Sequence, residues 1–164
     1  MINRRLCQLA AVALFTWHAG TAYAAPAASL SKDSFAQIRA RHAGQPLVVH
    51  IWGMTCGPCM VELPQWGALL RRQPRMKLVL IQADQAPAQA REQVLDQAGL
   101  GRAESWAATG ELDEYLRASI DRQWQGDMPR TLLITAQGEV TRIQGVANLA
   151  HVNQWLRQQT QTRP

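Results

Sequence analysis

Two cysteines stand where a buried strand pattern passes into a helix pattern. Leu47 to Trp52 is a nearly continuous apolar and β-branched run, which is typical of a strand buried on both faces. Cys56-Gly57-Pro58-Cys59 follows shortly and opens a segment that we expect to be helical as far as Arg72. Because redox-active dithiols occupy such strand-to-helix turns, the motif favours folds in which a central strand leads directly into a helix.

The position of the motif predicts different roles for the two sulfurs. Cys56 lies at the expected helix N-terminus, where free backbone N–H groups and the positive end of the helix dipole lower the pKa of a thiol. We therefore expect Cys56 to be the attacking thiolate. Cys59 lies one turn further along and is expected to stay protonated until it resolves the mixed disulfide. Pro58 suits the first turn of a helix.

A structural disulfide and half of a zinc site are the alternatives to redox chemistry. A structural disulfide normally links distant segments, whereas Cys56 and Cys59 are close in sequence. Zinc would need two further ligands at compatible spacing, and the chain contains only one more cysteine, Cys7. We therefore favour a redox pair and expect no metal and no cofactor.

Residues 1–24 have the three-part layout of a secretory signal peptide. Asn3-Arg4-Arg5 is basic, Leu6 to Trp17 is mostly apolar, and Ala22-Tyr23-Ala24 is a small-residue cleavage site. The apolar stretch is short for a membrane span. We expect cleavage after Ala24 and release into the periplasm, with an N-terminal membrane anchor as the alternative. Residues 25–164 then have a common size for one domain.

The remaining pattern alternates helices and strands. Residues 25–30 are expected to be a disordered lead-in. Helices are expected at 31–41 (capped by Ser31), 56–72 (kinked at Pro64), 88–98, 111–120 and 149–159 (capped by Asn148), and strands at 47–52, 77–83, 131–135 and 139–143. This order predicts an α/β fold in which a mixed β-sheet is flanked by helices on both faces. The net charge of +5 is mild and dispersed, so we expect no nucleic-acid partner.

The segment VVHIWGMTCGPCMVELP resembles the strand, W-G-x-x-C-x-P-C site and E-x-P helix of the thioredoxin superfamily, and within it the secreted TlpA/ResA-like disulfide reductases. The resemblance covers about 47–155 and implies a thioredoxin-like fold, with Cys56 as nucleophile and Cys59 as resolving cysteine. A second segment, WQGDMPRTLLITAQGE, resembles the stretch before the cis-proline strand. It implies that Pro129 is a cis-proline beside the dithiol and that Met128 is the variable residue before it.

Several neighbours of the motif are candidate substrate contacts. Trp52, Met128 and Trp124 are placed in a substrate groove, although a buried anchor is the alternative for Trp124. Arg130 is expected to be a solvated charge at a strand end. Thr55 stands where many relatives have a second tryptophan, so one wall of the usual surface is missing.

Two ionisable residues are candidates for proton chemistry. His50 precedes Cys56 by six residues and occupies the place of a buried aspartate in thioredoxins. It is either a hydrogen-bonded core residue or a neutral ring that accepts the proton of Cys59 near physiological pH. Glu62 matches an acidic residue of the family, and a first-turn carboxylate that favours the helix dipole is a sufficient explanation for it.

These observations predict a thiol:disulfide oxidoreductase that reduces disulfides of periplasmic proteins and is itself reduced by a membrane electron donor. A disulfide oxidase or isomerase is the second hypothesis, because a difference of about 30 mV corresponds to only about 1.4 kcal/mol. A copper-handling protein with Cys56, Cys59 and His50 as ligands is the third, since soft thiolates suit Cu(I). The sequence leaves the oligomeric state open.

Overall fold

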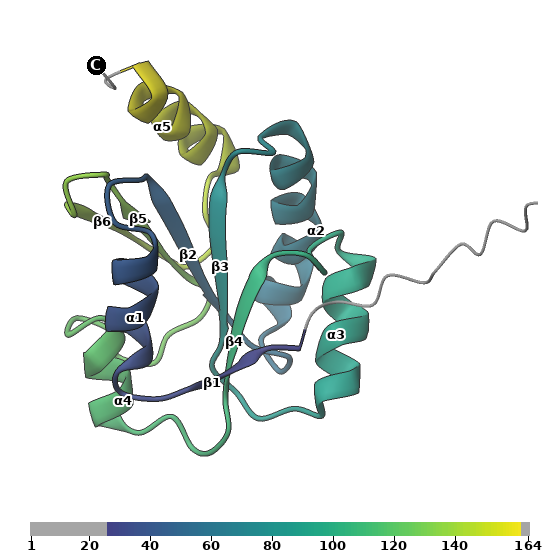
Figure 1. The fold of residues 1–164 in the computed structure, drawn as a ribbon. Helices are drawn as coiled ribbons and strands as arrows, with labels where there is room; N and C mark the ends of the chain where they lie inside the picture. The colour runs from purple at the N-terminus through teal and green to yellow at the C-terminus, as the bar shows by residue number, and fades with distance from the viewer. Residues whose placement is uncertain (1–25, 162–164) are drawn as a thin grey trace, which may run out of the picture.

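A single six-stranded sheet with helices on both faces forms the part of the chain that the computed structural model describes, residues 26–161 (Figure 1). The predicted signal peptide, 1–24, lies outside the described residues. The elements in chain order are β1 (Ala28–Leu30), α1 (Ser34–Arg41), β2 (Leu47–Trp52), α2 (Gly57–Arg72), β3 (Lys77–Gln82), α3 (Ala88–Gln97), β4 (Glu104–Ala108), α4 (Glu114–Ile120), β5 (Arg130–Ile134), β6 (Val140–Gln144) and α5 (Leu149–Gln161).

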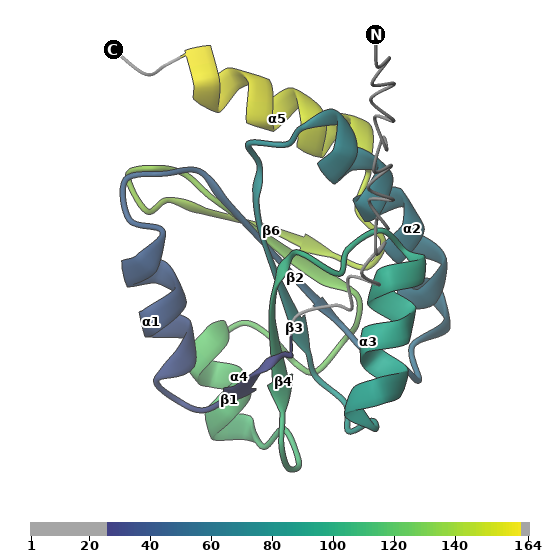
Figure 2. The same ribbon diagram turned by 45° about the vertical axis from the view of Figure 1, so that its right-hand side comes forward.

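The strand order is β1-β4-β3-β2-β5-β6; β5 runs antiparallel to both of its neighbours, β2 and β6, and all other neighbouring pairs are parallel. Helices α2, α3 and α5 cover one face of the sheet, and α1 and α4 cover the other (Figures 1 and 2). Each face has its own core of buried side chains. The predicted fold class, a mixed sheet flanked by helices on both faces, is therefore confirmed.

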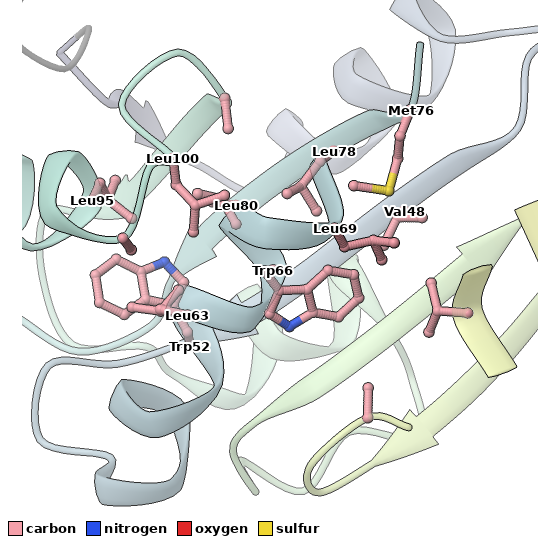
Figure 3. Close-up of a cluster of buried hydrophobic side chains, with 14 of the residues drawn as sticks. Val48, Trp52, Leu63, Trp66, Leu69, Met76, Leu78, Leu80, Leu95 and Leu100 are labelled. Carbon is pink, nitrogen blue, oxygen red and sulfur yellow. The ribbon is translucent and has the colours of Figure 1, made fainter. Parts of the chain in front are cut away.

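Strand β2 lies at the centre of the sheet, and all of its residues are buried. It pairs with β3 in parallel and with β5 in antiparallel orientation, so it needs apolar side chains on both faces. Val48, His50 and Trp52 point to the α2 face, where Trp52 and Trp66 lie among leucine side chains (Figure 3). A continuous apolar run here thus leads straight into the cysteine motif.

The sequence-based element order was wrong at two strands. Residues 25–30 were expected to be a disordered lead-in, but Ala28–Leu30 is strand β1 at the sheet edge. Glu104–Ala108 was not predicted and is strand β4. Neither segment contains a β-branched residue, and β1 is very short. Their strand conformation comes from pairing with each other and with β3, which a local pattern does not reveal.

Helix ends follow the predictions in part. Asn148 caps α5, because its side-chain oxygen accepts hydrogen bonds from the backbone N–H groups of Ala150 and His151. Helix α1 instead begins at Ser34, and Asp33 rather than Ser31 holds the N-cap position, without a side-chain cap. In the described part of the chain, no helix combines the length and apolar character needed to cross a membrane.

Glycine is required where α2 meets the segment after α3. A Cβ atom on Gly67 would lie 1.8 Å from the carbonyl oxygen of Ala98, so any larger residue would push the two segments apart. This close approach holds α2, which carries the cysteines, against the α3 side of the sheet.

Candidate active site

The two cysteines of the motif form a disulfide at the start of α2. Cys56 is the N-cap residue, and its sulfur accepts a hydrogen bond from the backbone N–H of Cys59 at 3.2 Å. Cys56 is partly exposed, whereas Cys59 is fully buried. In this arrangement a partner protein can reach Cys56 only, and a thiolate on Cys56 would be stabilised by the helix start.

Asp84, just beyond the end of β3, holds the loop that leads to Cys56. Its carboxylate accepts hydrogen bonds from the backbone N–H groups of Met54 at 2.9 Å and Thr55 at 2.7 Å. The Thr55 hydroxyl and the Gln82 amide also donate to it. Burial alone would raise the pKa of Asp84, but these hydrogen bonds outweigh burial and lower it. The loop is therefore tied to a carboxylate that is ionised at neutral pH.

This contact explains two residues of the motif. A Cβ atom on Gly53 would lie 2.9 Å from the Asp84 carboxyl group, so glycine is needed for the close approach. Thr55, noted above as a departure from many relatives, donates its hydroxyl proton to Asp84 at 2.9 Å. Sequence reasoning missed Asp84 because its partners are about thirty positions away in the chain.

Pro129 immediately precedes β5, the strand that pairs with β2. The Met128–Pro129 peptide bond is cis, as the resemblance implied. Ile51 of β2 pairs with Arg130 of β5, which brings Pro129 beside the end of β2, where the cysteine loop begins. Met128 is partly buried and packs against the cores of both faces.

Arg130, expected to be a solvated charge, is instead buried and paired. Its guanidinium donates from Nε at 3.0 Å and from Nη2 at 2.8 Å to Oδ2 of Asp121. Arg142 also donates to Asp121, and Asp127 lies 3.4 Å from Arg130 Nη1. Burial would raise the pKa of Asp121, but the hydrogen bonds and the positive charge of Arg130 lower it. This ion cluster fixes the segment that carries Met128 and Pro129.

The two tryptophans predicted to line a substrate groove lie in the core. Trp52 is 0% exposed and Trp124 is 3% exposed, so neither offers a surface to a substrate in this structure. Trp124 donates its indole N–H to the backbone oxygen of Asp127 at 2.8 Å, which matches the alternative of a buried anchor. Met128, the third candidate, remains a proposed substrate contact.

His50 is fully buried beneath α2. Its Nδ1 lies 3.0 Å from the Thr131 hydroxyl, its Nε2 has no hydrogen-bond partner, and its ring lies 5.0 Å from the Trp66 ring. Burial lowers the pKa of His50 to about 3. The predicted neutral ring agrees with this value. However, a group with so low a pKa is a weak base, which argues against His50 as a proton acceptor near physiological pH.

Glu62 is also buried, but its pKa is shifted upward, whereas that of His50 is shifted downward. It lies in the second turn of α2, so the explanation by a first-turn helix dipole is wrong. Its Oε1 accepts hydrogen bonds from Trp66 Nε1 at 3.0 Å and from the Ala147 N–H at 2.9 Å, while its buried Oε2 has no partner. Burial raises the pKa of Glu62 more than these hydrogen bonds lower it. Glu62 is thus a better proton acceptor than His50, and it lies one turn beyond Cys59.

No group of three or more histidine, cysteine or acidic side chains in residues 26–161 is arranged to hold a metal ion. In the oxidised protein, therefore, His50 does not join the two cysteines in a metal site.

The fold is shared with solved structures of thiol-disulfide proteins. A secreted Mycobacterium tuberculosis disulfide oxidoreductase homologous to E. coli DsbE matches with a TM-score of 0.59 and 20% sequence identity, over 73% of this chain and 85% of that chain. A thiol:disulfide interchange protein of the thioredoxin family from Chlorobium tepidum matches with a TM-score of 0.60 and 21% identity, over 73% and 83%. StoA from Bacillus subtilis matches with a TM-score of 0.54 and 20% identity, over 69% and 83%.

The sequence itself matches no protein-family model and no curated protein at a significant level. The structural matches establish that the chain has a thioredoxin-like fold with a disulfide-linked Cys-x-x-Cys pair at the start of its second helix. The resemblance to secreted TlpA/ResA-like proteins, inferred above from two motifs, is confirmed at the level of the fold.

Proposed function

We propose that the protein is a thiol:disulfide oxidoreductase that reduces disulfides in periplasmic proteins. The observation that carries the proposal is the difference between its two sulfurs: Cys56 caps a helix and is partly exposed, and Cys59 is bonded to it and fully buried. A structural disulfide needs no such difference. A dithiol that attacks with one sulfur and resolves with the other does.

The reaction begins with the reduced dithiol. The Cys56 thiolate, stabilised by the helix start and the Cys59 N–H, attacks one sulfur of the substrate disulfide. A Cys56–substrate disulfide forms, and the second substrate sulfur leaves as a thiolate that takes up a proton. Met128, at the edge of the site, is the side chain that we assign to contact with the bound substrate.

Resolution requires that Cys59 lose its proton. Cys59 and Glu62 are three positions apart on α2 and therefore lie on the same helix face. Glu62 takes the Cys59 proton on its unpartnered Oε2, and the resulting thiolate attacks Cys56. The substrate sulfur that was bonded to Cys56 leaves as a thiolate that takes up a proton, and the Cys56–Cys59 disulfide forms. Two electrons and two protons from a membrane donor then regenerate the dithiol.

Trapping of partner proteins tests the proposal. Cys59→Ser removes the resolving sulfur, so mixed disulfides between Cys56 and periplasmic proteins should accumulate and be visible on non-reducing gels. Cys56→Ser is the matched control and should trap few partners, because Cys59 is buried. Equal trapping by the two variants, or none by Cys59→Ser, would contradict the proposal. The redox state of the trapped partners in wild-type cells distinguishes the two directions of electron flow: free thiols indicate a reductase, and disulfides indicate an oxidase.

A further inference from the structure

A pocket of about 560 Å³ lies apart from the cysteines, between strand β1 and the start of helix α3. Its lining includes Ala28, Pro87, Ala88, Arg91, Ala107 and Thr109. The pocket lies where β3 and β4 end and the following loops begin. In open α/β sheets, this edge of the parallel strands is where ligands bind. Its volume is within the range of small-molecule sites.

Arg91 in this pocket is buried and has one long ion pair, to its chain neighbour Glu92. Its side chain is 9% exposed, and its Nε has no hydrogen-bond partner. Among the described residues its acidic contact is Glu92 at 3.6 Å, which is longer than a hydrogen bond. Residues 1–25 contain no aspartate or glutamate that might supply one. An arginine remains charged in a protein, and a buried charge is costly unless it is paired.

The start of α3 adds a second set of unused donors beside Arg91. The first-turn N–H groups have no acceptor within the helix, the N-cap residue is Pro87, and no side chain caps this end. The first turn also carries no acidic residue. Because helix side chains tilt toward the N-terminus, Arg91 in the fourth helical position reaches back over these N–H groups. Arg91 and the start of α3, at Pro87 and Ala88, line the same pocket.

We propose that this pocket binds a carboxylate through Arg91 and the first-turn N–H groups of α3. A guanidinium pairs with a carboxylate through two parallel hydrogen bonds, and a helix start favours negative charge. The site supplies one full positive charge and the fractional charge of the helix dipole, which matches a monoanion better than a phosphate dianion. The small alanine side chains leave room for an organic group attached to the carboxylate.

Titration of the full chain, labelled with nitrogen-15, tests the site by NMR. Acetate should shift the backbone N–H signals of residues 88–90 and the Arg91 Nε signal, with saturation in the millimolar range. Inorganic phosphate should bind these groups more weakly. An absence of saturable shifts at these groups, or tighter binding of phosphate, would overturn the proposal.

Variants separate binding from general effects of salt. Arg91→Met keeps the length of the side chain and should weaken acetate binding at least tenfold, whereas Arg157→Met on α5 should leave it unchanged. Ala88→Asp places a carboxylate in the first turn, so it should raise the melting temperature and weaken acetate binding. This second variant covers the case in which Arg91→Met fails to fold. Unchanged acetate affinity in both pocket variants would overturn the proposal.

The source of the carboxylate is distinguished by a short peptide with a free C-terminus and the same peptide with a C-terminal amide. Tighter binding of the free-acid peptide than of acetate identifies a peptide carboxylate as the ligand. Equal or weaker binding identifies a small free acid. Binding of the amide as tightly as the acid would contradict recognition of a carboxylate.

Discussion

Two neighbouring residues of strand β5, Arg130 and Thr131, belong to two buried polar clusters that differ in how their polar atoms are hydrogen-bonded. Arg130 points to the α1 and α4 face and joins an ion cluster in which Asp121 accepts hydrogen bonds from two arginines. Thr131 points to the α2 face and contacts His50, in a cluster where His50 Nε2 and Glu62 Oε2 have no partner. Both carboxylate oxygens of Asp121 are hydrogen-bonded, whereas His50 and Glu62 each have one buried polar atom without a partner.

The difference separates a structural role from a chemical one. Hydrogen bonds and the Arg130 charge hold the pKa of Asp121 below its ordinary value, so its charge is fixed at neutral pH. Burial raises the pKa of Glu62, so its proton can be exchanged at lower cost. The proposed function assigns proton transfer during turnover to the cluster that contains Glu62.

The largest expected effect comes from breaking the ion cluster. Asp121→Ala removes the closest partner of the buried Arg130 guanidinium and leaves it only the more distant Asp127 carboxylate, at 3.4 Å, which should lower the free energy of unfolding by about 3–5 kcal/mol. Urea denaturation at pH 7 measures the change. Glu62→Gln is the matched control in the other cluster and should not destabilise the protein, because it removes a buried charge that has no cationic partner. Similar decreases in the free energy of unfolding in both variants would contradict the assignment of different roles to the two clusters.

His50 should make the protein sensitive to acid. Its pKa is about 3 in the folded protein and 6.5 in the unfolded chain, so between these values only the unfolded chain binds the proton. The free energy of unfolding should therefore fall as the pH is lowered from about 6.5 toward 3. His50→Asn should have a flatter dependence over this window. Urea denaturation at several pH values measures both, and identical slopes would contradict the burial of a neutral ring.

The effect of Glu62 on the pH dependence of stability should be opposite in sign to that of His50 and smaller. Its pKa in the folded protein lies above its ordinary value of 4.5, so the folded protein holds the proton that the unfolded chain has released. The contribution of Glu62 to stability is thus largest below pH 4.5 and is lost as the pH rises through the raised pKa. Glu62→Gln should remove this loss, and denaturation at pH 4 and pH 7 compares the two proteins. A larger decrease in the free energy of unfolding between pH 4 and pH 7 in Glu62→Gln than in the wild type would contradict a raised pKa of Glu62.

The smallest effect is expected at the rim of the ion cluster. The Arg142 side chain is 38% exposed, so its bond to Asp121 competes with water. Arg142→Met should lower the free energy of unfolding by less than about 1 kcal/mol, since Arg130 still pairs with Asp121. A loss as large as that of Asp121→Ala would mean that the cluster depends on its exposed member.

Local sequence patterns correctly predicted the features that neighbouring residues form by themselves. The β2 run, the dithiol at the helix start and the Asn148 cap depend on residues close together in the chain, and the structure contains all three. The contact of Asp84 with Thr55 and the pairing of β1 with β4 join distant segments, and no local pattern reveals them. Arg130 looked solvated at a strand end because its partner, Asp121, belongs to another element.

The central claim is that Glu62, rather than His50, accepts the proton of Cys59. Rapid-mixing experiments with a fluorescent disulfide substrate separate attack by Cys56 from resolution by Cys59. In Glu62→Gln, attack should be nearly unchanged and resolution at neutral pH should slow by about a hundredfold. In His50→Asn, resolution should stay close to the wild-type rate. Resolution at the wild-type rate in Glu62→Gln, together with slow resolution in His50→Asn, would contradict the account.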